Sequence, residues 1–180
     1  MLPGQVTQNG CMKTPYRICF VCTGNICRSP AAEVIVRALA DRAGEVGIEV
    51  DSAGTGDWHV GDPADPRALR ALSAAGYDGG LHRARGFDAG WFRERELIIA
   101  LDRGHARVLR SWAPDAASAA RVRLLRSFDP AAGVDEDDPL IDVLDPYYEA
   151  DAAFTAMVAQ IEAAAAGLLA DLRSRSRLQG

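Results

Sequence analysis

The sequence has few cysteines, and none follows position 27. The 180 residues include four, which are Cys11, Cys19, Cys22 and Cys27. The disulfide framework of a small secreted domain would be spread along the chain, so this class of protein is excluded. The cysteines lack the paired spacing of a zinc site, and the three histidines are scattered. We therefore expect a protein of the reducing cytoplasm that binds no metal.

The sequence also lacks a surplus of positive charge. Its formal net charge is −5 at pH 7, whereas a general nucleic-acid binder carries a basic face. Nucleic acid is therefore excluded as a partner. An anionic substrate would have to be held by a few local groups, because the overall field of the molecule repels it.

No apolar run in the sequence suggests a length sufficient to span a membrane. We predict no membrane-spanning segment, and residues 1–14 have neither the apolar core nor the cleavage site of a secretion signal. Because these first residues are rich in Gly, Pro, Gln and Asn, we predict a flexible N-terminal tail over 1–14. The remainder, 15–175, has the length and composition of one globular domain. We expect it to be a monomer without a membrane partner.

Short apolar segments alternate with segments of helical periodicity along this domain. Strands are predicted over 17–21, 48–53, 97–101 and 122–125, and helices over 30–42, 65–75, 103–113 and 148–173. The alternation is typical of an α/β fold with a parallel sheet. Ligands of such sheets bind beyond the carboxyl ends of the strands. The segment after Val21, the loop 54–61 and Asp102 all follow predicted strands, so we expect them to lie at one edge.

The segment from Cys22 to Ser29, which reads Cys-Thr-Gly-Asn-Ile-Cys-Arg-Ser, carries the chemistry. It joins a strand to a helix N-terminus, where backbone N–H groups and the helix dipole favour a bound anion. These groups also favour the thiolate form of a cysteine, which is the nucleophilic form. The guanidinium of Arg28 can hold two oxygens of a phosphate. The pattern predicts a Cys22 thiolate that faces a bound oxyanion.

Four segments of the chain together resemble the low-molecular-weight protein tyrosine phosphatases, and among them the actinobacterial secreted-type enzymes. They are Val21–Pro30, Asp51–Gly61, Ala100–Asp102 and Asp145–Tyr148, and the resemblance extends from about Arg17 to Arg173. It implies one four-stranded parallel sheet of order 2-1-3-4 with helices on both faces. It also implies a bacterial signalling enzyme that hydrolyses phosphotyrosine through a phosphocysteine intermediate, without a cofactor. By analogy with the family, the resemblance also allows secretion without a leader peptide.

The resemblance implies three catalytic residues. Cys22 is the nucleophile, Arg28 binds the phosphate, and Asp145 is the general acid and base. The chain has five Asp-Pro dipeptides, so the dipeptide alone selects none of them, but two tyrosines follow Asp145. Asp142 is the alternative acid.

The remaining site residues are also implied by the resemblance. The expected phosphate and substrate contacts are Thr23, Gly24, Asn25, Ile26, Cys27, Ser29, Trp58, His59, Tyr147 and Tyr148. A supporting network is expected from Ser52, His82 and Asp102: Ser52 and His82 hold the loop together with Asn25, and Asp102 orients Arg28 or Ser29. The expected partners are tyrosine-phosphorylated proteins, and phosphate or other oxyanions in the loop. Cys27 could form a protective disulfide with Cys22.

Three other functions are weighed against this one. A protein-arginine phosphatase of the same family would carry Thr in place of Ile26. A thioredoxin-coupled arsenate reductase of the same fold would need further cysteines near 82–100, and this chain has none after Cys27. A non-enzymatic phosphate-binding module would not need Cys22, Arg28 and Asp145 together.

Overall fold

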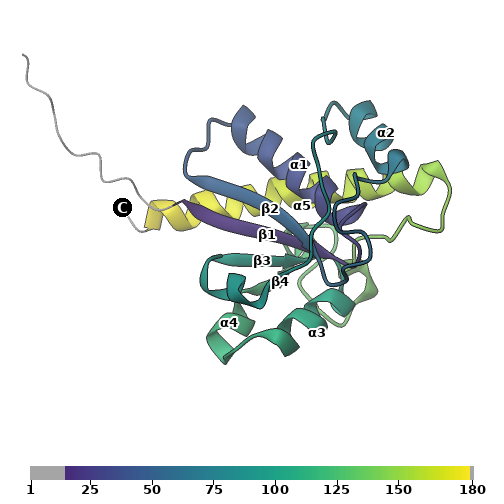
Figure 1. The fold of residues 1–180 in the computed structure, drawn as a ribbon. Helices are drawn as coiled ribbons and strands as arrows, with labels where there is room; N and C mark the ends of the chain where they lie inside the picture. The colour runs from purple at the N-terminus through teal and green to yellow at the C-terminus, as the bar shows by residue number, and fades with distance from the viewer. Residues whose placement is uncertain (1–14, 179–180) are drawn as a thin grey trace, which may run out of the picture.

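A computed structural model describes residues 15–178 of the chain, in which one four-stranded sheet forms the centre (Figure 1). The central strand β1 (Tyr16–Cys22) pairs with β2 (Ile48–Gly54) on one side and β3 (Leu97–Ala100) on the other, and β4 (Val122–Leu124) pairs with β3. All pairs are parallel, in the order β2-β1-β3-β4. The predicted α/β fold and strand order are confirmed. The predicted tail over 1–14 lies outside the described residues.

The strand β1 is apolar on both sides because a helical layer covers each face of the sheet. Ile18, Phe20 and Cys22 lie in one core, whereas Cys19 and Val21 lie in the other. Successive side chains of a strand point to opposite faces, so an unbroken apolar run is what a doubly covered strand requires. The Cys22 thiol therefore ends the strand on the face that packs against α1.

The helices are divided between the two faces (Figure 1). Three of them share the first core: α1 (Arg28–Arg42), α2 (Pro66–Ala74) and α5 (Asp151–Leu178). On the other face lie α3 (Arg103–Trp112), which shares the second core, and α4 (Ala116–Ala120). Short 3₁₀ helices follow at η1 (Ala89–Arg93), η2 (Leu125–Phe128) and η3 (Pro139–Ile141). The sequence analysis predicted neither α4 nor the 3₁₀ helices, because none is long enough to show a period.

Two helix starts differ from the predictions by more than one residue, and both differences concern the site. Helix α1 begins at Arg28, two residues before Pro30, so Arg28 belongs to the first helical turn. Helix α5 begins at Asp151, so the prediction of a helix from Tyr148 is wrong. The turn in which Glu149 N–H donates to the Pro146 carbonyl keeps both tyrosines outside the helix.

Helix α5 corrects the expectation that no segment could cross a membrane. From Asp151 to Arg175 it is long enough, and its most apolar stretch has a mean hydropathy of 1.5. Its many alanines raise this value. Phe154, Met157 and Ile161 of α5 are fully buried in the core shared with α1 and the sheet. The helix is thus packed as a core element of this domain.

Candidate active site

The thiol of Cys22 lies at the carboxyl end of β1, where the loop 23–27 turns into α1. Cys22 is 3% exposed, and its Sγ lies 3.0 Å from the Ser29 hydroxyl. Ser29 Oγ accepts a hydrogen bond from Asn25 and lies 3.2 Å from the Ala53 carbonyl. The single hydroxyl proton of Ser29 can therefore point to either the sulfur or the carbonyl. When sulfur is a thiolate, this proton can stabilise its charge.

The loop is held in its shape by Asn25, which is fully buried. Its φ of 54° is the one positive value outside glycine among residues 15–178. The Asn25 amide nitrogen donates to the hydroxyls of Ser29 and Ser52 at 2.8 and 2.9 Å. The amide oxygen accepts from the Arg85 backbone N–H at 2.9 Å. These bonds compensate the left-handed conformation, which costs roughly 1–2 kcal/mol.

His82 adds a further contact to this network. Its Nε2 lies 2.7 Å from the Asn25 carbonyl oxygen. Burial lowers the pKa of His82, so the ring is neutral at pH 7 and Nε2, which faces an acceptor, carries the proton. The Ser52 hydroxyl donates its own hydrogen bond to the Glu33 carboxylate at 2.6 Å. The structure thus places Ser52 and His82 in contact with Asn25.

Arg28 is buried between two carboxylates at the other end of the loop. Its Nη1 donates to Asp102 at 2.7 Å, and its Nη2 donates to Asp145 at 2.8 Å. Burial acts to raise the pKa of Asp102, but interactions with His105 and Arg28 outweigh it, and the net direction is down. Asp102 therefore stays ionised and anchors one arm of the guanidinium.

The two candidate acids, Asp142 and Asp145, differ in the groups that they bind. The carboxylate of Asp142 accepts from the Arg103 backbone N–H at 2.8 Å and from its guanidinium at 3.0 Å. It is therefore tied to the start of α3. Asp145 lines the same cavity as Cys22 and Arg28, and its side chain is 55% exposed. Of the two carboxylates, Asp145 is the one placed to reach a substrate above the thiol.

The site opens into a cavity of about 510 Å³ with aromatic side chains at its mouth. It is lined by Cys22, Thr23, Gly24, Ile26, Cys27, Arg28, Trp58, His59, Asp145, Tyr147 and Tyr148. Tyr147 and Tyr148 meet edge to face with ring centroids 4.9 Å apart. Asn25 and Ser29 are fully buried and are not among the residues that line this cavity. Their side chains bond to one another behind the loop, at 2.8 Å.

The family model of low molecular weight phosphotyrosine protein phosphatases matches residues 17–178 of the chain. The chain belongs to this family. A low molecular weight protein-tyrosine-phosphatase of Streptomyces coelicolor is 52% identical over 164 residues, which cover 89% of this chain and 95% of the relative. Protein-tyrosine phosphatase A of Mycobacterium tuberculosis is 46% identical over 158 residues, covering 87% and 91% of the two chains.

The fold matches solved structures of the family as well. A crystal structure of a protein tyrosine phosphatase from Entamoeba histolytica, with Hepes in its active site, superposes with a TM-score of 0.82 at 26% identity. The superposition covers 89% of this chain and 99% of the other. The chain is thus a protein-tyrosine-phosphatase, and the arginine phosphatase and arsenate reductase alternatives are not favoured.

Two glycines position parts of this phosphatase site that sequence reasoning did not explain. A Cβ on Gly54 would lie 2.6 Å from the Thr23 carbonyl oxygen, because the end of β2 packs directly on the loop. A Cβ on Gly56 would lie 1.2 Å from the Trp58 ring, so the indole rests on the bare backbone of Gly56. Backbone N–H groups of Thr55 and Gly56 also bind the carbonyls of Cys22 and Thr23 at 2.8 and 2.9 Å.

Sequence reasoning also missed three polar residues that support the loop. Glu33 accepts from Ser52, Arg85 binds Asn25 through its backbone, and His105 contacts Thr23. Arg85 and His105 lie 60 and 82 residues away from their partners in the sequence. No local pattern identifies such contacts.

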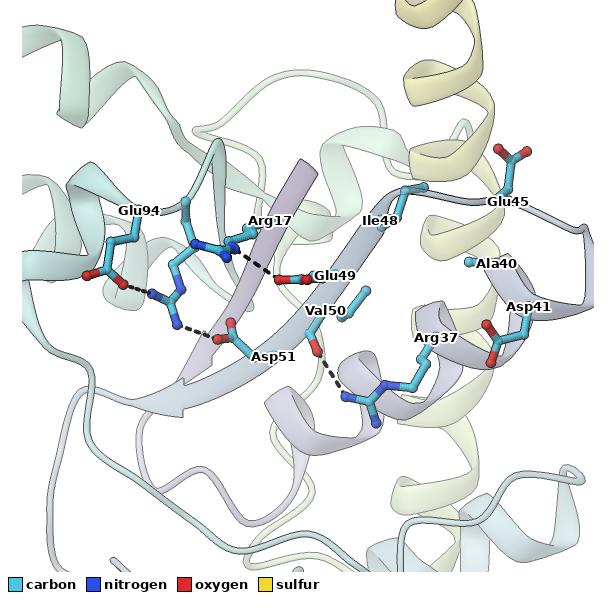
Figure 2. A pocket seen from close by; sticks show the side chains of 11 residues that line it. Arg17, Arg37, Ala40, Asp41, Glu45, Ile48, Glu49, Val50, Asp51 and Glu94 are labelled. Atoms are coloured by element: carbon cyan, nitrogen blue, oxygen red, sulfur yellow. Dashed lines mark hydrogen bonds and ion pairs between the residues drawn. The ribbon is translucent and has the colours of Figure 1, made fainter. Parts of the chain in front are cut away.

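A second cavity lies on the opposite half of the sheet, around the beginnings of β1 and β2 (Figure 2). Its volume, about 610 Å³, exceeds that of the active-site cavity. Its charged side chains pair with one another, as in Arg17 with Glu49 and Arg95 with Asp51 and Glu94. It contains no nucleophile, so chemistry and not size distinguishes the phosphatase site.

Cys27 lies in the wall of the active-site cavity but differs from Cys22 in its surroundings. Burial raises the pKa of the Cys27 thiol well above its usual range, so it remains protonated at neutral pH.

Among residues 15–178, no group of three or more His, Cys, Asp and Glu side chains is arranged to hold a metal ion.

Proposed function

We propose that this phosphatase removes phosphate from tyrosine side chains of proteins, with Cys22 as nucleophile, Arg28 as phosphate ligand and Asp145 as acid and base. The observation that carries these assignments is the convergence of the three side chains on one cavity, with Ser29 in contact with the Cys22 sulfur. Loop amides and the first turn of α1 supply further donors for the phosphate oxygens.

The first step transfers the phosphoryl group to the enzyme. The Cys22 thiolate attacks phosphorus, an S–P bond forms, and the P–O bond to the tyrosine ring breaks. Protonated Asp145 gives its proton to the leaving phenolate oxygen, so tyrosine departs neutral. The aromatic residues at the mouth favour a ring over a short serine side chain, because the thiol lies at the bottom of the cavity.

The second step releases phosphate. The Asp145 carboxylate takes a proton from water, the water oxygen bonds to phosphorus, and the S–P bond breaks. Ser29 can donate its hydroxyl proton to the emerging thiolate, which is 3.0 Å away. A single carboxyl group thus serves as acid in one step and base in the next.

Asp145 and Asp142 provide a matched pair for testing this mechanism. Asp145→Asn is expected to lower kcat for a phosphotyrosine peptide about 10²–10⁴-fold, because general acid–base catalysis is lost. Asp142→Asn is the control, since its carboxylate binds Arg103, and it should lower kcat far less. Equal losses in the two variants would contradict the assignment.

Cys22→Ser tests the nucleophile directly. The variant is expected to lose turnover while it still binds the phosphopeptide, and a phosphoenzyme trapped by acid quench should be absent from it. Retained hydrolysis by Cys22→Ser would overturn the proposed covalent mechanism.

We further propose that the enzyme acts as a monomer in the cytoplasm. The three cysteines between residues 15 and 178 are free thiols, which suits a reducing compartment. Light scattering of the purified protein in solution measures the molar mass, and a mass of twice 19.2 kDa would contradict the monomer.

A further inference from the structure

His105 is a buried histidine that the proposed mechanism does not use. It lies in the first turn of α3 and is 5% exposed. Its Nε2 lies 2.8 Å from the hydroxyl of Thr23, the residue that follows the nucleophile. Helix α3 otherwise packs on the face of the sheet opposite α1, so His105 reaches the loop from a separate element.

The other ring nitrogen of His105 faces Asp102. Nδ1 lies 3.0 Å from Asp102 Oδ1 without a well-aligned hydrogen bond to any protein group of the described residues. The same Oδ1 accepts from the His105 backbone N–H at 2.8 Å. The second oxygen, Oδ2, holds Arg28. Thr23, His105, Asp102 and Arg28 therefore form one chain of contacts that joins the two ends of the phosphate loop.

The protonation of the ring follows from its surroundings. Burial lowers the pKa of His105 to about 4, so the ring is neutral at pH 7. A carboxylate oxygen can only accept, so the proton of the neutral ring belongs on Nδ1, beside Asp102. Nε2 is then the acceptor, and the Thr23 hydroxyl donates to it.

We propose that His105 is a positioning residue for the phosphatase reaction: as the Nδ1–H tautomer it fixes Thr23 against Asp102 and so sets the loop around the Arg28 guanidinium. The inference rests on the proposed function of the loop. Donors that stabilise a transition state must be in place before the reaction, and a displacement of about 1 Å can cost about 10²-fold in rate. The contacts through His105 and Asp102 connect Thr23, at the start of the loop, to Arg28, directly after it, and so limit such displacement.

A double-mutant cycle tests this inference. Thr23→Val removes the hydroxyl with little change of shape, and His105→Ala removes the ring. Each is expected to lower kcat for a phosphotyrosine peptide about 10- to 100-fold with a smaller change in KM. The double variant should be no slower than the slower single variant, because both remove the same contact. Losses that multiply would overturn the proposal.

Two further variants separate positioning from folding. His105→Gln keeps a polar atom near the place of Nε2 and is expected to recover most of the kcat that His105→Ala loses. Leu109→Ala leaves a cavity in the same helix without touching Thr23, and it should lower the unfolding midpoint while kcat stays near wild type. If Leu109→Ala lowers kcat as much as His105→Ala, or if Gln restores nothing, the proposal is wrong.

The tautomer gives a readout that does not depend on turnover. In ¹⁵N–¹H spectra of the full-length protein, the His105 ring should show its proton on Nδ1, and Thr23→Val should leave it there. A proton on Nε2 would contradict the proposed positioning role of His105 even if the mechanism at Cys22 holds. Because Cys22→Ser tests that mechanism separately, the failure of one does not imply the failure of the other.

Discussion

Asn25 and His105 show how single residues restrain a loop that would otherwise not hold its shape. Asn25 adopts a left-handed conformation and forms hydrogen bonds to three segments of the chain: the start of α1, strand β2 and residues 82–85. Asparagine tolerates this conformation better than other side chains with a Cβ. His105 contacts Thr23 at the start of the loop, and its burial makes the stability of the protein sensitive to acid.

The pKa of His105 predicts a loss of stability in weak acid. The value is about 4 in the folded protein and near 6.5 in the unfolded chain, so the unfolded state binds more protons between these values. Stability should therefore fall as pH falls through this window, by about 2 kcal/mol between pH 7 and pH 5. The charged groups that act on the ring are Asp102, Arg28, Asp145 and Asp142.

Urea unfolding of the wild type and of His105→Gln at pH 7 and pH 5 measures this effect. The variant lacks the titrating group, so it should lose about 2 kcal/mol less than the wild type over the same interval. His82 shifts in the same direction and remains in both proteins, so it cancels in the comparison. Equal losses in both proteins would contradict the assignment.

At the scale of elements, the end of β2 supports the loop through contact between backbones. Gly54 pairs with Gly86 in an isolated bridge, yet the two positions differ in their surroundings. A Cβ on Gly54 would meet the Thr23 carbonyl, whereas a Cβ on Gly86 would have no heavy atom within 4 Å.

This difference predicts that the same substitution, Gly to Ala, has a large effect at position 54 and a small effect at position 86. Gly54→Ala should destabilise the protein by roughly 1–3 kcal/mol and lower kcat, because the loop must move away from the new methyl group. Gly86→Ala should change both by little. Thermal unfolding and phosphopeptide turnover of the two variants measure this, and a similar effect at both positions would refute close packing as the cause.

The order of elements was predictable from the sequence, whereas their supports were not. Apolar runs and caps such as Asp65 with Pro66 indicated the sheet and its helices, and Asp65 does accept from the Arg67 backbone N–H. The start of α5 was predicted too early, since Tyr148 and Glu149 have no local signal against a helix. The contact of Arg67 with the Glu149 carbonyl and the Tyr147 ring holds that segment in a loop.

The candidate site was predictable for a different reason. Cys22, Arg28 and their neighbours lie in one short segment, and Asp145 is marked by the tyrosines that follow it. Gly54, Arg85, Glu33 and His105 act through contacts that only the folded chain creates. Their roles therefore required the structure.

At the scale of the whole molecule, charge should influence which phosphopeptides bind. The molecule carries a net charge of −5, and exposed carboxylates flank both aromatic walls of the cavity: Asp57 precedes Trp58, and Glu149 follows Tyr148. Basic residues beside the phosphotyrosine would find opposite charge there.

We expect kcat/KM to be about three- to tenfold higher for a peptide with Lys or Arg flanking phosphotyrosine than for one with Asp or Glu, at low salt. The preference should shrink in 0.5 M NaCl, where charges are screened. Replacing Asp57 with Asn and Glu149 with Gln together should remove much of it. An unchanged preference in that double variant would show that other groups select the substrate.

The position of Arg28 between two carboxylates has a consequence for repeated turnover. The arm on Asp102 can stay in place, while the arm on Asp145 can be exchanged for a phosphate oxygen and later returned. A buried guanidinium therefore never has to exist without a counter-charge, a state that would cost several kcal/mol. The phosphate group of an incoming substrate replaces the Asp145 carboxylate on Arg28, and the carboxylate returns when phosphate departs. The enzyme can thus begin each cycle with its loop already in shape.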